Sequence, residues 1–183
     1  MAGRRILVYL LRRDLRLADN PILHHLSSNK NHGFDLLLPV YVFPRTQIEV
    51  SGLAKDGAKS PYPQARSPVG NFWRCGPHRA KFVAESVWDL KKSLQTSGSD
   101  LLVRFGDQET VVQQIIGHYK DTNTPVGAVW MTEDVSWEER QEEKAVAAAC
   151  SDSKVDFKLW KDEKYFIDEY TNPISSFLTA IRC

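Results

Sequence analysis

Short apolar runs alternate with longer amphipathic segments along the chain. The runs lie at residues 6–11, 34–43, 100–106, 127–133 and 155–160. The first of them, ILVYLL, contains no charged residue, which is typical of a strand buried on both faces of a parallel sheet. The segments between the runs are predicted to be helices from their apolar spacing and their start signals, and they lie at 21–28, 79–95, 109–119 and 136–150.

This alternation predicts one α/β domain. Strand–helix–strand units cross over in the right-handed sense, which gives a parallel sheet covered by helices on both faces. We therefore predict a doubly wound, five-stranded parallel sheet with the Rossmann-like strand order 3-2-1-4-5. The length of 183 residues is enough for one such domain, and the sequence contains no internal repeat.

The starts of two helices are marked by capping residues. Asp19 or Asn20 is expected to cap a helix whose first residue is Pro21, since proline suits that position. Ser136 is followed three residues later by Glu139, which predicts a capping box at the start of the fourth helix.

The helix predicted over 79–95 is preceded by a long segment without a regular pattern. From Pro44 to Pro77 the chain is rich in Ser, Pro, Gly, Lys and Arg, and we expect a surface loop that is disordered over 51–69. In the helix itself, the residues predicted to face the sheet are Phe82, Val83, Val87, Leu90 and Leu94.

Composition and motifs narrow the possible chemistry. The formal net charge of +1 gives no overall electrostatic footprint for nucleic acid or a membrane, and no apolar run is long enough to span one. The three cysteines, Cys75, Cys150 and Cys183, form no metal-binding pattern, so neither a disulfide framework nor a metal site is predicted. No glycine-rich phosphate loop follows the first strand, which disfavours the usual dinucleotide and P-loop sites.

Charged residues gather where the first strand ends. In open α/β sheets ligands bind beyond the carboxyl ends of the strands, where residues 12–20, the loop after Phe43 and residues 132–139 would meet. Two structural explanations stay open for the first segment: internal pairs such as Arg13–Asp14 and Arg16–Asp19, or contacts with a neighbouring domain. The residues predicted to line a cleft or a domain interface are Arg13, Asp14, Arg16, Asp19 and Asn20.

Two carboxylates open the fourth helix. Glu138 and Glu139 suit the positive end of the helix dipole, which explains them without a ligand. Alternatively, one of them accepts charge-assisted hydrogen bonds from a ring with amide or amino groups, such as a pterin. The five tryptophans fall on separate predicted elements, and we interpret them as packing residues without a connected chain.

Several of these segments, in this order, resemble the photolyase/cryptochrome family. LRRDLRLADNPIL is similar to the family's opening motif, and LLPVYVFPR to its second strand. The stretch from GPHRAKFVAESVWDLKK to VRFGDQETVV, then VWMTEDVSWEERQEE and VDFKLWKDEKYFIDE, continue the resemblance, which is strongest to DASH-type cryptochromes. It covers about residues 4–168, so we expect residues 1–168 to form the family's N-terminal α/β domain and 169–183 to be a tail or truncated linker.

The resemblance implies a light-harvesting role. In folate-using members, methenyltetrahydrofolate serves as the antenna chromophore, and a glutamate in the first turn after the fourth strand contacts it. By motif position that glutamate is Glu139, with Glu138 beside it. The family's FAD, its electron-transfer tryptophans and its DNA contacts belong to a helical domain that this sequence does not match. No catalytic residue is therefore predicted here, and the chain alone is expected to be photochemically incompetent, with FAD and DNA bound only through that domain.

Other functions stay open from the sequence. The chain could be a stand-alone α/β module that binds a nucleotide or another protein, or a truncation product without a function. No clear targeting signal is present, which is compatible with the cytoplasm, the nucleus or an organelle.

Overall fold

The computed structural model describes residues 4–46, 64–67 and 70–162. Most of the predicted disordered loop 51–69 and the whole predicted tail 169–183 lie outside the described residues. The upper boundary of the predicted domain, residue 168, lies outside them as well.

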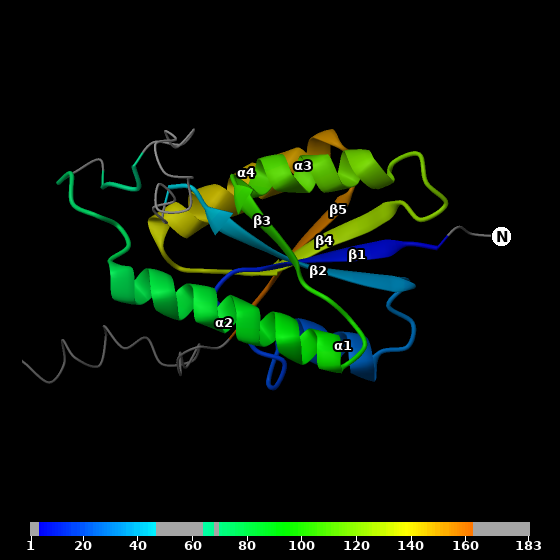
Figure 1. Cartoon of the computed structure of the whole chain (residues 1–183). Helices are drawn as coiled ribbons and strands as arrows, with labels where there is room; N and C mark the ends of the chain where they lie inside the picture. The colour runs from blue at the N-terminus through cyan, green and yellow to red at the C-terminus, as the bar shows by residue number, and fades with distance from the viewer. Residues whose placement is uncertain (1–3, 47–63, 68–69, 163–183) are drawn as a thin grey trace, which may run out of the picture.

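Five parallel strands form one sheet, and their order β3-β2-β1-β4-β5 confirms the predicted fold class (Figure 1). The central strand β1 pairs with β2 on one side and with β4 on the other. The bounds of the strands are β1 Ile6–Leu11, β2 Leu36–Pro44, β3 Leu102–Gly106, β4 Val126–Thr132 and β5 Asp156–Trp160.

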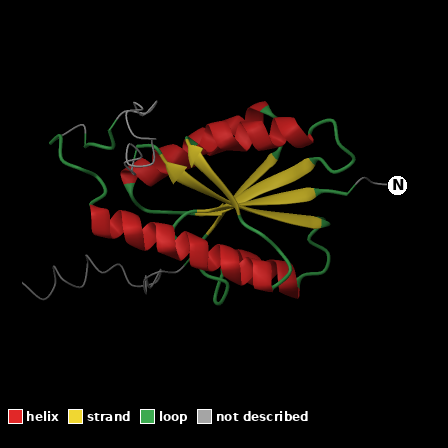
Figure 2. Cartoon of the chain, viewed as in Figure 1, coloured by secondary structure: helices red, strands yellow, loops and turns green. Residues whose placement is uncertain are grey.

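Helices cover both faces of the sheet (Figures 1 and 2). The helices α1 (Pro21–Ser28) and α2 (Pro77–Thr96) lie on one face, while α3 (Gln108–Tyr119) and α4 (Trp137–Asp152) lie on the other. All four were predicted from the sequence, with ends that differ by a few residues.

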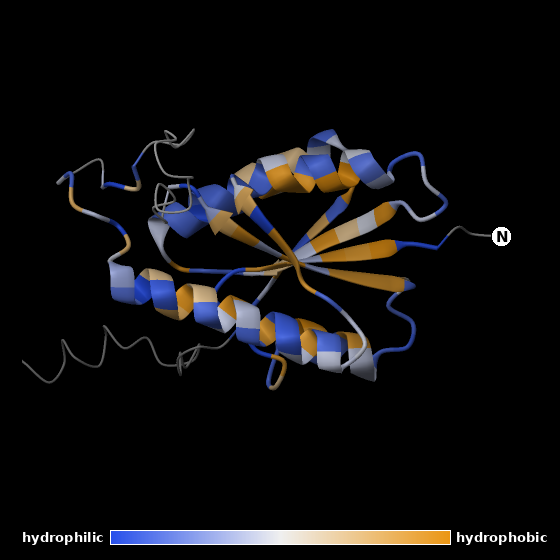
Figure 3. Ribbon diagram, in the orientation of Figure 1, coloured by the Kyte–Doolittle hydropathy of each residue, from blue (hydrophilic) through white to orange (hydrophobic). Residues whose placement is uncertain are grey.

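The two faces of β1 supply the centres of two hydrophobic cores. Because side chains alternate along a strand, Ile6, Val8 and Leu10 enter the core under α3 and α4. Leu7, Tyr9 and Leu11 enter the core under α1 and α2. All six residues are buried, which explains why this run is apolar without interruption. Figure 3 shows the corresponding hydrophobic colouring along the central strands.

One predicted core residue of α2 is exposed. Val87, Leu90 and Leu94 are buried and Val83 packs against them, as predicted. Phe82, in contrast, is 69% exposed. It precedes Val83 by one residue, so it lies about 100° around the helix from Val83 and leaves the buried stripe.

The two predicted helix caps differ in outcome. The Asn20 side chain accepts hydrogen bonds from the backbone N–H groups of Ile22 and Leu23, both at 3.1 Å, and Pro21 begins the helix as predicted. Ser136 occupies the N-cap position of α4, but its hydroxyl donates to Asp134 Oδ1 at 3.2 Å and caps no helix N–H. The predicted capping box is therefore wrong, because Glu139 turns to Arg13 instead.

The tryptophans are not all isolated. The rings of Trp130 and Trp160 lie 4.9 Å apart between centroids, and the His25 ring contacts both. Trp130, Trp160 and His25 come from β4, β5 and α1, which are brought together by the fold and are far apart in the sequence. The expectation that the tryptophans are unconnected is therefore wrong for Trp130 and Trp160. Among the described helices, none has the length and apolar character needed to cross a membrane.

Candidate functional site

The carboxyl ends of β1 and β4 meet beside the start of α4. Arg12 and Arg13 follow β1 directly, and residues 133–136 connect β4 to α4. The strands are neighbours in the sheet, so segments about 120 residues apart in the sequence meet at this edge. This confirms the expected meeting of residues 12–20 with residues 132–139.

Arg12 is the buried cation of this edge. Its guanidinium donates to Glu143 Oε1 at 2.6 Å, to the Glu139 backbone carbonyl at 3.3 Å, and to the carbonyl of Thr132. The side chains of Arg12 and Glu143 are 7% and 9% exposed. Glu143 Oε1 also accepts from the backbone N–H of Asp134 at 2.7 Å. Arg12 thus fixes the path from β4 into α4, a role that the sequence analysis did not assign to it.

Arg13 lies at the surface of the same edge. It forms ion pairs with Glu139 and, at 3.4 Å, with Asp134. Its side chain is 48% exposed, whereas that of Glu139 is 8% exposed. The alternative of an Arg13–Asp14 pair is therefore wrong.

Asp14 belongs to a buried network under the loop after β1. It is fully buried, and it accepts hydrogen bonds from the Tyr9 hydroxyl and from the Arg12 backbone N–H at 2.9 Å. Asn20 Nδ2 donates to the Tyr9 hydroxyl oxygen at 2.6 Å. Burial, together with the adjacent Asp14 carboxylate, raises the pKa of the Tyr9 phenol far above its ordinary value. Asp14 and Asn20 therefore fix the shape of the loop.

Arg16 connects the same loop to the end of β5. Its Nη2 donates to Asp162 Oδ1 at 2.7 Å and to the Asp19 backbone carbonyl at 3.0 Å. The hydrogen bond to Asp162 raises the pKa of the guanidinium. The suggested Arg16–Asp19 contact thus exists through the backbone, while the Asp19 carboxylate is not part of it. Arg16, Asp19 and Asn20 line an open hollow beside α1.

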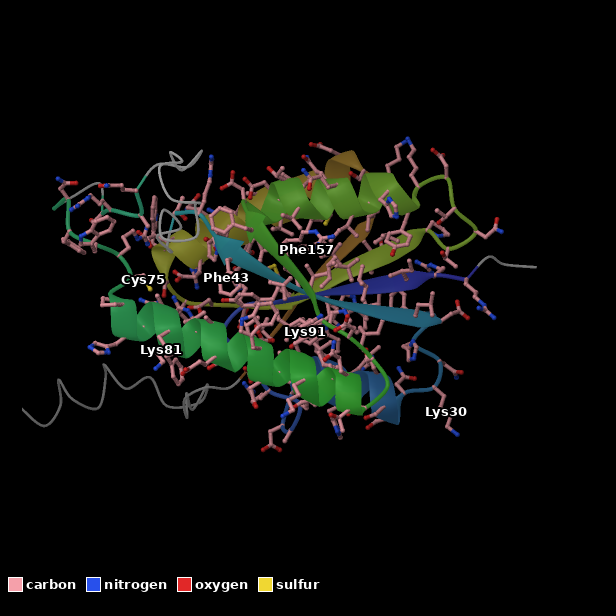
Figure 4. All side chains as sticks on the ribbon, in the orientation of Figure 1. Lys30, Phe43, Cys75, Lys81, Lys91 and Phe157 are labelled. Atoms are coloured by element: carbon pink, nitrogen blue, oxygen red, sulfur yellow. The ribbon has the colours of Figure 1, made fainter. Side chains whose placement is uncertain are left out.

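A smaller cavity of about 170 Å³ lies at the carboxyl edge between the beginnings of α2 and α4. Its wall combines aliphatic and aromatic side chains with a few polar ones. Figure 4 shows Cys75 at the beginning of α2 and Phe43 on β2, on the side of the molecule where this cavity lies. Its polar and charged lining includes Arg13, Tyr41, Arg79, Gln108, Glu139 and Glu142.

The two carboxylates singled out in the sequence have different environments. Glu139 lines the cavity, and only its Oε1 accepts a hydrogen bond within the described residues, from Arg13. Glu138 is 43% exposed, forms an ion pair with Arg74, and does not line the cavity. Glu139 is therefore the better placed of the two to contact a molecule in the cavity.

Several polar residues of the cavity were missed in the sequence, among them Tyr41 and Gln108. Tyr41 comes from β2, and burial raises the pKa of its phenol to about 12. Gln108 is the first residue of α3 and is 4% exposed, yet its Oε1 has no hydrogen-bond partner among the residues that the structure describes. Gln108 follows the end of β3 by two residues, so the rule that ligands bind beyond strand ends would have selected it.

Comparison with protein families matches residues 7–168 to the DNA photolyase model. The chain is 54% identical over 172 residues to a protein of Gibberella zeae named putative cryptochrome DASH, covering 94% of this chain and 24% of that protein. It is 55% identical over 170 residues to a Neurospora crassa protein named putative cryptochrome DASH, mitochondrial, covering 92% and 23% of the two chains. The chain thus spans about a quarter of the length of these relatives.

Solved structures agree with this match at the level of the fold. The crystal structure of a Synechocystis cryptochrome superposes with a TM-score of 0.70 at 24% identity, covering 98% of this chain and 33% of that one. An archaeal photolyase from Sulfolobus tokodaii, described with two FAD molecules, superposes with a TM-score of 0.62 at 20% identity, covering 96% and 34%.

Proposed function

This chain belongs to the DNA photolyase family, with cryptochromes of the DASH type among its relatives, and we propose that it is the antenna-chromophore domain of such a protein. The matched residues correspond to the α/β domain and to about a quarter of the relatives' length. The proposed chromophore is folate-type, and methenyltetrahydrofolate is the candidate. FAD binding, photochemistry and contact with DNA are proposed to require the helical domain, which the matched quarter does not include.

The observation that carries the proposal is the position of Glu139 in the cavity wall. A carboxylate at this position can accept hydrogen bonds from the N–H groups of a pterin ring. The described contacts occupy Oε1 through Arg13, which leaves Oε2 as an acceptor for a ligand. Leu15, Val42 and Val83 give the cavity an apolar wall suited to a planar ring. The residues present therefore fit the group.

Arg13 would prepare Glu139 for this contact. Its pairing with Oε1 fixes the orientation of the Glu139 side chain before a ligand binds. Asp134 holds the other end of the Arg13 guanidinium. The ion pairs of the edge thus position the acceptor, and the folate, when bound, would supply absorption of near-ultraviolet light.

Titration of the 183-residue chain with methenyltetrahydrofolate, followed by near-ultraviolet absorbance and induced circular dichroism, tests the proposal. We expect saturable binding that Glu139→Gln weakens by at least about tenfold, since a hydrogen bond to a charged group is worth roughly 1.5–3 kcal/mol. Glu138→Gln should weaken binding less, and Glu85→Gln, on the exposed face of α2, is the matched control. Absence of binding, or equal binding by Glu139→Gln, would contradict the proposal.

A further inference from the structure

The backbone at the start of α2 has hydrogen-bond donors that the helix itself does not use. The first hydrogen bond of the helix runs from the N–H of Ala80 to the carbonyl of Gly76, at 3.0 Å. The N–H groups of His78 and Arg79 precede it and therefore have no acceptor within the helix. None of residues 77–80, all of which the structure describes, is acidic, whereas two glutamates lie in the first turn of α4. Free N–H groups and the positive end of the helix dipole both favour negative charge at this point.

The side chain of Arg79 adds a positive charge to the same end of the helix, where a cation opposes the dipole. Arg79 is exposed, lines the cavity, and forms no ion pair within the part of the chain that the structure describes. Lys81 differs, because Glu85 pairs with it at 3.7 Å. Residues 57–84 include no Asp or Glu, so the neighbouring sequence supplies no carboxylate for Arg79.

The Tyr41 hydroxyl reaches the same place from β2. Tyr41 is 5% exposed and lines the cavity, and its hydroxyl has no hydrogen-bond partner among the described residues. The hydroxyl is not one of the polar atoms sealed from solvent, so a molecule in the cavity can reach it. Burial raises the pKa of the phenol, and the strongest of the other influences is Arg79, which lowers the pKa. The remaining influences come from Cys75 and Glu142, which also line the cavity, so the hydroxyl lies in the cavity beside the start of α2, where Figure 4 shows Cys75.

We infer that the start of α2 is an oxyanion subsite of the cavity, in which the Tyr41 hydroxyl, the Arg79 guanidinium and the free N–H groups of the first turn bind a carboxylate or phosphate group. Glu142 repels an anion from the α4 side of the cavity, but its effect on Tyr41 is smaller than that of Arg79. The inference goes beyond the proposed chromophore contact, because Glu139 comes from α4 and the subsite is built on α2 and β2. The oxyanion is either a free ion or a tail carboxylate of the bound folate.

The first experiment uses inorganic phosphate on the 183-residue chain. We expect the midpoint of thermal unfolding to rise saturably with sodium phosphate, compared with sodium chloride at equal ionic strength, because an ion that binds the folded state stabilises it. Arg79→Gln and Tyr41→Phe should each weaken the apparent phosphate affinity by about tenfold, since each removes a donor to a charged group. Phosphate also stabilises proteins in general by exclusion from their surface, but that effect does not saturate and persists in the variants.

Lys81→Gln is the matched control. It removes a positive charge from the same helix end, but Lys81 is paired with Glu85 and is not among the cavity-lining residues that the structure describes. We expect it to leave the phosphate effect unchanged. A phosphate effect that Arg79→Gln and Tyr41→Phe leave intact, or that Lys81→Gln reduces equally, would overturn the inference.

The second experiment separates the two sources of the oxyanion. It compares methenyltetrahydrofolate with its diamide, in which neutral amides replace both tail carboxylates. If a tail carboxylate occupies the subsite, the diamide should bind about tenfold more weakly, and Arg79→Gln should weaken binding of the folate only. If the occupant is a free ion, both ligands should bind equally while the phosphate effect stays sensitive to Arg79→Gln.

These outcomes also separate the inference from the proposed function. Folate binding that depends on Glu139, without a phosphate effect that depends on Arg79 and Tyr41, would overturn the oxyanion subsite alone. A phosphate effect that depends on Arg79 and Tyr41, without any folate binding, would support the subsite and contradict the proposed chromophore.

Discussion

Arg12 and Glu143 form a buried ion pair, with Nη2 2.6 Å from Oε1 and neither side chain more than 9% exposed. The pair joins the end of the central strand to the second turn of α4. Burial of both charges makes the pair costly to break from one side, because the remaining charge has no access to water. The Arg12–Glu143 pair therefore stabilises the edge of the sheet that carries the proposed site, although Glu143 is not one of the acceptors in the cavity wall.

Removing one partner of this pair should strongly destabilise the fold. We expect Glu143→Leu to lower the free energy of unfolding by about 3 kcal/mol or more, measured by urea denaturation, since Arg12 remains buried and unpaired. In the double variant Arg12→Met/Glu143→Leu, the loss should be smaller than the sum of the two single losses. Additive losses would show that the pair has no coupling energy.

Glu139→Gln should be tolerated far better than Glu143→Gln, although the two residues lie one turn apart. The partner of Glu139 is Arg13, which is 48% exposed and also contacts Asp134. An exposed partner can be solvated when it loses its carboxylate, so we expect a change below about 1 kcal/mol. Thermal unfolding of the two variants side by side makes the comparison. A similar loss in both would mean that exposure of the partner does not decide the cost.

The two helix N-caps should respond differently to alanine. Asn20→Ala removes two hydrogen bonds to the start of α1 and the donor to Tyr9, so we expect a loss of about 1–2 kcal/mol in urea denaturation. Ser136→Ala removes no cap hydrogen bond and should cost clearly less. Asn20→Asp keeps the cap acceptor but brings a second carboxylate near Asp14, so it should not restore wild-type stability. Equal effects at both caps would contradict this interpretation.

Alkaline pH should destabilise the protein in part through Tyr41. Burial raises the pKa of this phenol from 10.0 to about 12, so the folded state favours the neutral form. The stabilisation is fully present below pH 10 and is lost as the pH rises from 10 towards 12. Tyr41→Phe should reduce the loss over this window by about 2–3 kcal/mol, measured as the free energy of unfolding against pH. An equally steep decline in the variant would contradict the assignment, and values at pH 7 serve as the reference.

Most of the fold was predictable because β1 is apolar throughout and strands alternate regularly with helices. A parallel strand that is buried on both faces appears in the sequence as a continuous apolar run. The right-handed crossover rule then predicts a parallel sheet with helices on both faces. Phe82 was misplaced because its hydrophobicity suggested burial, whereas its angular position on α2 puts it beside the cavity mouth. Helical spacing alone does not show which of two adjacent apolar residues at the edge of a helix's buried face is buried and which is exposed.

The site was predicted less completely than the fold. Arg13 was selected because it follows a strand end, and Glu139 because it lies in the first turn of a helix and at the motif position of the family it resembles. The structure brings the two together. Arg12 was not singled out, since its role depends on Glu143 and on the carbonyl of Thr132, more than 100 residues away. Gln108 has no local sequence signal other than its distance from a strand end. Contacts of this range depend on strand order, which periodicity does not encode.

The position of β1 at the centre of the sheet has a consequence for synthesis on the ribosome. Its first neighbour, β2, emerges about thirty residues later, whereas its second neighbour, β4, begins at Val126. Until then, one side of an entirely apolar strand offers unpaired backbone groups to any other extended chain, and Arg12 has no Glu143 to pair with. A nascent chain that stalls before β4 is thus an incomplete sheet that is prone to aggregate. When β4 and α4 emerge, β4 pairs with the free edge of β1 and Glu143 pairs with Arg12.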